Sequence, residues 1–143
     1  MNVKSILAAK GGDIISIEPT ADLAAAAKLL SVHRIGAVII LGAGGRIAGI
    51  LSERDIVRAL AEHGAGALAL PVGQVMTRNV ATCCEDDSAA SIMERMTAGK
   101  FRHLPVVEKD KLVGLISIGD VVKQRVEEAE RESEAMRDYI RTA

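Results

Sequence analysis

Aromatic residues are almost missing from this chain of 143 residues, which has one Tyr, one Phe and no Trp. Proteins that bind single-stranded nucleic acid usually stack the bases on aromatic side chains, so this class is disfavoured. The formal net charge is -1, so no basic excess marks the chain as a binder of DNA or RNA. We therefore expect no nucleic-acid partner.

Cysteine is limited to the neighbouring residues Cys83 and Cys84. Adjacent cysteines do not easily bridge to each other, and one pair is no disulfide framework. Long apolar runs are missing too. No segment approaches the ~20 apolar residues of a membrane span, and the N-terminal run is too short for a signal peptide. We interpret both thiols as reduced and expect a cytoplasmic protein without a membrane partner.

The patterns of several enzyme classes are also absent. Gly42–Gly45 lacks the spacing of a dinucleotide-binding loop, and no Walker-type phosphate loop occurs. His33, His63 and His103 are scattered, and no His-x-x-x-His or Cys-x-x-Cys pair offers a metal site. Nothing resembles a nucleophile elbow. We expect a protein that is not an enzyme, with no catalytic residues and no metal.

An internal repeat organises what is present. Residues 14–40 match residues 80–106 at one constant offset, and the match continues from Gly49 against Gly114. Even the lead-in repeats, because residues 3–7 resemble residues 72–76. The chain therefore contains two copies of one unit.

Each copy predicts the order strand, helix, strand, strand, helix. The expected strands are residues 14–17, 37–41 and 47–51 in the first copy, and 80–83, 104–107 and 112–116 in the second. The first helix of each copy is expected over residues 21–32 or 88–98, with Thr20 or Asp22, and Asp87 or Ser88, as the N-cap.

A lone copy of about 60 residues is marginal in stability, so we expect the two copies to share a core. The predicted fold is α+β, with copies at residues 1–66 and 67–126 packed through their sheets in pseudo-two-fold symmetry. Residues 65–71 connect the copies, and residues 127–143 prolong the last helix.

The prolonged helix carries a narrow heptad pattern. Its members are Val122, Val126, Ala129, Ser133, Met136 and Ile140. Two interpretations stay open. One is a solvated surface helix with a single buried stripe, and the other is a helix that forms a dimer.

The element Ser-x-x-Asp occurs where the last strand of each copy meets a helix, as Ser52 with Asp55 and Ser117 with Asp120. A capping box explains such a pattern, and an Asp in the first turn suits the helix dipole. A helix N-terminus also binds anions, while a carboxylate accepts hydrogen bonds from ribose hydroxyls. Recurrence at the same strand end favours a nucleotide site.

A basic pair, Arg102 and His103, precedes a strand of the second copy. The Arg102 guanidinium is suited to clamp phosphate oxygens, and His103 is the weaker candidate. The first copy has Gly36 and Ala37 at these positions and lacks the basic pair. A positive charge at a site in the first copy must then come from Arg54 or Arg34. We expect two inequivalent sites.

These repeats resemble the CBS domain, which occurs in tandem as a Bateman module. The resemblance is carried by Val75-Met76-Thr77, by Arg102–Val107 and by the two Gly-x-x-Ser-x-x-Asp elements, and it covers about residues 3–126. It implies a small stand-alone pair that binds AMP, ADP, ATP, S-adenosylmethionine or NAD(H) between the repeats. Such modules act as energy or redox sensors and usually pair into dimers.

By this resemblance, Asp55 and Asp120 hold ribose, while Ser52, Ser117, Arg102 and His103 meet phosphate. Ser16 and Thr82 line the pocket near the base and the phosphate. The complete predicted set of ligand-binding residues is Ser16, Ala37, Ser52, Arg54, Asp55, Thr82, Arg102, His103, Pro105, Ser117 and Asp120.

The leading hypothesis is a non-enzymatic sensor that binds an adenine nucleotide, forms a homodimer and signals to an unknown protein partner. The alternative is a dimeric interaction or scaffold protein that uses its C-terminal helix and binds no ligand. An enzyme of an unrecognised class is the third hypothesis.

Overall fold

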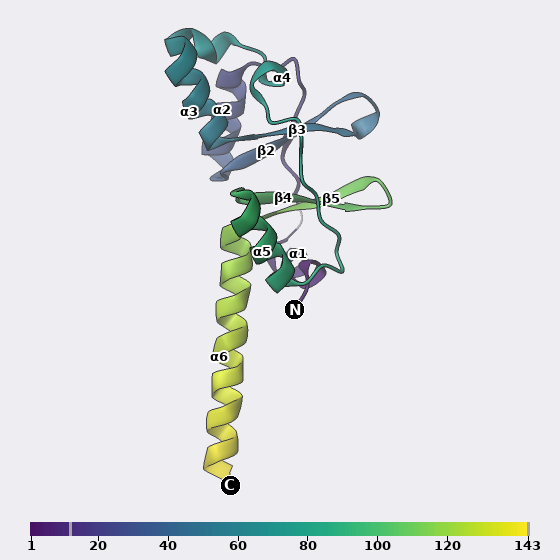
Figure 1. Ribbon diagram of the computed structural model, residues 1–143, viewed down its shortest axis with the longest axis vertical. Helices are drawn as coiled ribbons and strands as arrows, with labels where there is room; N and C mark the ends of the chain where they lie inside the picture. Colours follow the sequence, from purple (N-terminus) through teal and green to yellow (C-terminus); the bar gives the residue numbers. More distant parts are fainter. Residues whose placement is uncertain (12, 143) are drawn as a thin grey trace.

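A computed structural model describes residues 1–11 and 13–142 of the chain. Two hairpin-based sheets lie one above the other, with helices on the outer side of each sheet, and a long C-terminal helix leaves the body (Figure 1). The elements are α1 (Val3–Lys10), β1 (Ser16–Ile17), α2 (Leu23–His33), β2 (Ala37–Leu41), η1 (Ala43–Gly45), β3 (Ile47–Ser52), α3 (Glu53–His63), η2 (Gly64–Ala69), α4 (Val72–Val75), α5 (Ala89–Gly99), β4 (His103–Glu108), β5 (Lys111–Ser117) and α6 (Ile118–Thr142). The predicted mixed fold of two repeats is confirmed.

The first sheet has the order β1-β2-β3, with β1 parallel to β2 and β2 antiparallel to β3. The hairpins form because runs of β-branched and aliphatic residues flank short turns. Asp22 and Ser88 are the N-caps of α2 and α5, and each side chain accepts a hydrogen bond from the backbone three residues on. In both cases the structure selects one of the two predicted caps.

The predicted strand over residues 80–83 is wrong. Among the described residues, the second sheet contains only β4 and β5, and Cys83 forms an isolated parallel bridge to Val106. The reason lies in Pro105. In the first copy, the Ile39 amide donates to the Ile15 carbonyl at 3.4 Å and extends the pairing of β1. Pro105 occupies the matching position of the second copy and has no N–H to donate.

The lead-in helices are exchanged between the copies. Val3 and Ile6 of α1 are buried in the core of the second copy, while Val72 of α4 belongs to the core of the first. The fit of α1 is close, because a Cβ added to Gly114 of β5 would stand 2.6 Å from Leu7 Cδ2. The N-terminal helix is therefore part of the second copy's core.

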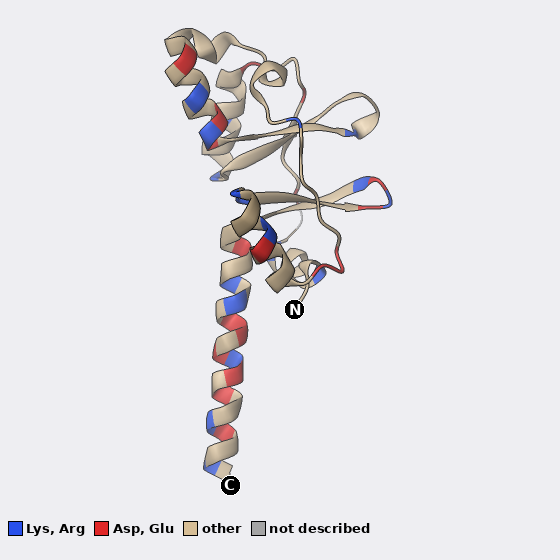
Figure 2. Cartoon of the chain, viewed as in Figure 1, with Lys and Arg blue, Asp and Glu red and all other residues tan. Residues whose placement is uncertain are grey.

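The long helix α6 projects away from both sheets (Figure 1). Charges of both signs are spread along it (Figure 2). Val121 is its one buried residue, and the large apolar side chains that are exposed along it are Val122, Val126, Met136, Tyr139 and Ile140. The stripe that the sequence predicts is thus left uncovered by the described part of the chain.

Over residues 1–11 and 13–142, no helix combines the length and the apolar character needed to cross a bilayer. Both cysteines are free thiols. Cys83 is buried, and burial, with a smaller effect of the nearby Asp87 carboxylate, raises the pKa of its thiol to about 12. Cys84 is exposed.

Candidate functional site

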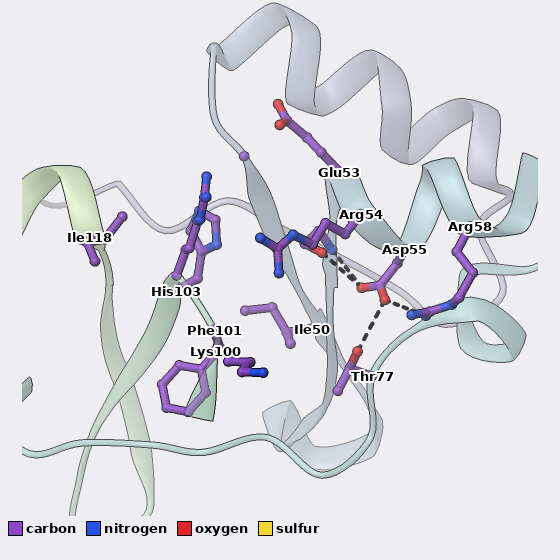
Figure 3. Close-up of a pocket in the computed structure, with 13 residues that line it drawn as sticks. Ile50, Glu53, Arg54, Asp55, Arg58, Thr77, Lys100, Phe101, His103 and Ile118 are labelled. Carbon is purple, nitrogen blue, oxygen red and sulfur yellow. Dashed lines mark hydrogen bonds and ion pairs between the residues drawn. The ribbon is translucent and has the colours of Figure 1, made fainter. Parts of the chain in front are cut away.

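A cavity of about 470 Å³ opens between the two copies. Its volume falls within the range of about 300–1,000 Å³ that is typical of small-molecule sites. It is lined by Gly36, Ile50, Ser52, Glu53, Arg54, Asp55, Arg58, Thr77, Lys100, Phe101, Arg102, His103 and Ile118. Figure 3 shows residues of the α3 side and of the β4 side facing one another across it.

Asp55 forms the most constrained part of the first wall, and it is 4% exposed. Its Oδ2 accepts hydrogen bonds from the Ser52 amide at 2.9 Å and the Ser52 hydroxyl at 3.3 Å. Its Oδ1 accepts from Arg58 Nη2 at 2.6 Å and Thr77 Oγ1 at 3.3 Å (Figure 3). The buried charge is therefore paired and hydrogen-bonded on both oxygens, as burial of a carboxylate requires.

Basic side chains dominate the cavity. Four cationic residues, Arg54, Arg58, Lys100 and Arg102, meet two carboxylates, those of Glu53 and Asp55. Arg58 is held by its ion pair with Asp55 at 2.6 Å. A cleft lined by an excess of one charge attracts ligands of the other sign, so this cavity favours an anion.

The cavity also has an apolar part, made by Ile50, Phe101 and Ile118. Phe101 is the chain's one phenylalanine, and it lies beside Arg102 at the entrance to β4. A cavity that joins apolar walls to a few charged groups suits a ligand with a flat apolar ring and an anionic end.

His103 lies at the contact between the copies. A Cβ added to Gly36 would stand 3.1 Å from its Nε2, so the ring packs directly on the first copy. Burial is the main cause that lowers the pKa of His103, and the Lys10 ammonium adds to this, while Glu53 and Asp120 act in the opposite direction. Charged groups of both copies therefore influence the pKa of this imidazole.

The second Ser-x-x-Asp element borders the cavity without lining it. The Ser117 amide donates to Asp120 Oδ2 at 2.9 Å, and the Asp120 amide donates to Ser117 Oγ at 3.2 Å. Lys10 Nζ lies 2.8 Å from the same Oδ2. Burial acts to raise the pKa of Asp120, but the bonds from Lys10 and Ser117 outweigh it and hold that pKa below its usual value.

The structure brings five of the predicted site residues together in this cavity, namely Ser52, Arg54, Asp55, Arg102 and His103. Ser16 lines a different cavity, of about 560 Å³, near the tips of the two hairpins. The remaining predicted residues lie outside both cavities, and they are Ala37, Thr82, Pro105, Ser117 and Asp120. Ala37 and Pro105 are buried in the strands that hold the site.

Sequence reasoning missed several lining residues. Arg58 follows Asp55 at a spacing of three, which places both on one helix face, so a signal for it existed. Lys100 lies two residues before Arg102, the first residue of the basic pair. Thr77 directly follows the lead-in of the second copy. Its contact with Asp55 follows from the exchange of the lead-in segments, which the repeat pattern does not reveal.

The model of the CBS domain family matches residues 3–62 and 72–127 of the chain. A curated relative is the mitochondrial CBS domain-containing protein CBSX3 of Arabidopsis thaliana, which is 32% identical over 119 residues. That match covers 80% of this chain and 58% of the relative, so the chain spans less than two thirds of that protein's length.

Solved structures give the same result. The CBS-domain protein ATU1752 of Agrobacterium tumefaciens is 45% identical, with a TM-score of 0.85 over 87% of this chain and 92% of that one. The CBS pair of MJ0100 was solved with 5′-methylthioadenosine and S-adenosylmethionine; it is 27% identical, with a TM-score of 0.80 over 90% of this chain and 98% of that one. PAE2072 of Pyrobaculum aerophilum was solved with AMP; it is 28% identical, with a TM-score of 0.75 over 84% and 89% of the two chains.

Proposed function

The chain belongs to the CBS-domain family, and we propose that it is a regulatory module that binds an adenosine-containing nucleotide in the cleft between its two repeats. The observation that carries the proposal is the cavity of about 470 Å³, in which four cationic side chains and three apolar ones converge from both repeats. The adenosine ligands of MJ0100 and PAE2072 support the same ligand class.

In this proposal the parts of the ligand meet different walls. The base packs on Ile50, Phe101 and Ile118. The phosphate pairs with the guanidinium of Arg102 and its cationic neighbours, because bidentate guanidinium contacts suit phosphate oxygens. The ribose hydroxyls donate to the carboxylate of Asp55, which lines the cavity. AMP, ADP, ATP, NAD(H) and S-adenosylmethionine all contain the required adenosine.

Signalling then follows from the position of the site between the repeats. A ligand that touches both repeats favours one relative arrangement of them, and a partner protein that binds this arrangement better raises ligand affinity by the same factor. We propose such sensing of cellular energy or redox state by a cytoplasmic homodimer, without catalysis and without a metal.

The first test is a thermal-shift screen of the purified chain against AMP, ADP, ATP, NAD⁺, NADH, S-adenosylmethionine and adenosine, followed by calorimetry of each ligand that shifts Tm. A ligand at 100 times its Kd stabilises the fold by about 2.7 kcal/mol, or several degrees of Tm. Stabilisation by at least one phosphate-bearing ligand is expected. No shift with any of them would contradict the proposal.

The matched variants are Arg102→Gln in the cavity and Arg131→Gln, which removes the same charge from the exposed surface of α6. A lost charged hydrogen bond costs about 1.5–3 kcal/mol, so Arg102→Gln should weaken nucleotide binding roughly 10- to 150-fold. Arg131→Gln should leave the Kd unchanged. Equal effects of the two substitutions would place the ligand elsewhere.

One observation favours a second candidate function, that of an interaction or scaffold protein. The apolar side chains of α6, among them Met136 at 61% and Ile140 at 67% exposure, are available to another helix. In this alternative the cavity stays empty, and the Ser-x-x-Asp elements only cap helices.

A further inference from the structure

The N-terminal helix supplies a cation to the second repeat. Lys10, the last residue of α1, donates through Nζ to Asp120 Oδ2 at 2.8 Å and to the Leu115 carbonyl at 2.7 Å. Both acceptors belong to the strand-to-helix junction of the second repeat. The ammonium therefore neutralises the carboxylate of an element that lies more than a hundred residues away in the chain.

This ion pair borders the candidate cavity. Ser117 pairs with His103 across the β4–β5 hairpin, and the Ile118 amide donates to the Arg102 carbonyl at 2.8 Å. His103, Arg102 and Ile118 all line the cavity. Asp120 lies two residues beyond Ile118, in the first turn of α6. The charge of the Asp120 carboxylate, or its neutralisation by Lys10, therefore changes the electrostatic potential at a ligand in the cavity.

The two Ser-x-x-Asp elements obtain their cations differently. Asp55 is paired with Arg58 of its own helix. The residue that matches Arg58 in the second repeat is Lys123, which is exposed, whereas Asp120 is paired with Lys10. The exchange of α1 between the repeats thus provides the second carboxylate with a partner from outside its own repeat.

We propose that Lys10 is a specificity-determining residue, which makes the site accept 5′-phosphorylated adenosine ligands by cancelling the charge of Asp120. The inference rests on the proposed function. It adds that the preference for an anionic over a neutral ligand depends on a residue of the exchanged N-terminal helix.

The electrostatic reasoning is direct. A carboxylate beside the cavity repels a phosphate dianion, and the repulsion is strong where the site is partly shielded from water. A carboxylate paired with an ammonium at 2.8 Å acts as a near-neutral group. An ammonium has three N–H donors, of which two are used on Asp120 and Leu115. The ligand therefore meets no uncompensated negative charge at Asp120.

The test compares AMP with adenosine by calorimetry in the wild-type chain, in Lys10→Met, which keeps the apolar stem, and in Lys10→Arg, which keeps the charge. Lys10→Met should weaken AMP binding about tenfold and leave adenosine binding within about twofold. Lys10→Arg should restore AMP binding largely. Lys4→Met, on the exposed surface of the same helix, is the matched control and should change neither affinity.

A second variant separates electrostatics from tethering of α1. In Lys10→Met, the further change Asp120→Asn removes the uncompensated charge, so the ratio of AMP to adenosine affinity should return to its wild-type value even if both affinities fall. Should Lys10→Met not fold, Lys10→Gln serves in its place. A parallel loss of AMP and adenosine binding in Lys10→Met, or no change in either, would overturn the role of Lys10. A wild-type chain that binds neither AMP nor adenosine would also overturn the role of Lys10, whereas a chain that binds no ligand of the thermal-shift screen would refute the proposed function itself.

Discussion

The hydroxyl of Thr77 lies 3.3 Å from Oδ1 of Asp55, although Thr77 belongs to the second repeat and Asp55 to the first. Lys10 and Asp120 show the reverse relation, because the N-terminal helix of the first repeat reaches the carboxylate of the second. Each Ser-x-x-Asp element is therefore completed by a residue that the exchange of lead-in segments delivers. The two elements are alike in plan and unequal in burial, since the side chain of Asp55 is 5% exposed and that of Asp120 is 24% exposed.

This inequality predicts different stability costs for the two carboxylates. Asp55→Ala leaves the partly buried donors of Ser52 and Thr77, and the more exposed Arg58 guanidinium, without their acceptor, and the expected cost is about 2–3 kcal/mol. Asp120→Ala removes a more exposed cap and should cost about 1 kcal/mol. Urea denaturation of both variants measures the difference, and equal costs would contradict the structural distinction.

Gly49 gives a sharper packing prediction. A Cβ at this position would stand 2.7 Å from the Thr77 carbonyl oxygen, in the backbone pairing of Ile50 with Thr77. Gly49→Ala should therefore destabilise the fold by about 1–3 kcal/mol through overpacking. Gly66→Ala is the control, because a Cβ there meets nothing within 4 Å. Unfolding free energies that match for both variants would show that the lead-in of the second repeat does not pack on β3 in this way.

Much of this architecture is predictable because it depends on patterns between residues that are close in the sequence. The hairpins, the two first helices and the helix after each Ser-x-x-Asp element follow from alternation, helical spacing and capping residues that lie close together in the sequence. Five of the site residues that the sequence predicts also lie together in one cavity, namely Ser52, Arg54, Asp55, Arg102 and His103.

What escaped prediction depends on long-range partners. Repeat spacing does not tell which sheet a lead-in segment packs against, so neither Lys10 at Asp120 nor Thr77 at Asp55 was expected. The absence of the predicted strand over residues 80–83 has a cause in the sequence. Pro105 cannot donate the hydrogen bond that the matching residue Ile39 donates in the first repeat. That cause becomes visible only once the register of the parallel pairing is known.

The environment of His103 predicts a pH dependence of stability. Burial lowers the pKa of this imidazole in the folded state, and Lys10 and Arg102 act in the same direction against Glu53 and Asp120. The unfolded chain then binds more protons than the folded one around and below the ordinary His pKa of about 6.5. Stability rises with pH wherever the unfolded state binds more protons. It should therefore fall as the pH drops from about 7.5 to about 5.5.

Urea denaturation across this pH range tests the prediction in the wild-type chain, in His103→Gln and in His33→Gln, whose side chain is exposed on α2. His103→Gln should flatten the loss of stability at low pH, and His33→Gln should leave it unchanged. The Asp120 carboxylate, whose pKa is lowered, loses its contribution only as the pH falls below about 4, so it does not confuse the comparison. An unchanged slope in His103→Gln would contradict the assignment.

The exposed apolar stripe of α6 predicts self-association of the chain. Its heptad positions Val126, Met136 and Ile140 are at least half exposed, and a second copy of the same helix offers a matching seam. Sedimentation of the wild-type chain should therefore give the mass of a dimer. Met136→Glu combined with Ile140→Glu should weaken association at least tenfold, because the double substitution places two charges on the apolar face of each paired helix. Ala135→Glu adds the same kind of charge on the outer face of the helix and should leave the dimer intact. A monomeric wild-type chain, or a dimer that survives the double substitution, would show that α6 does not join the subunits.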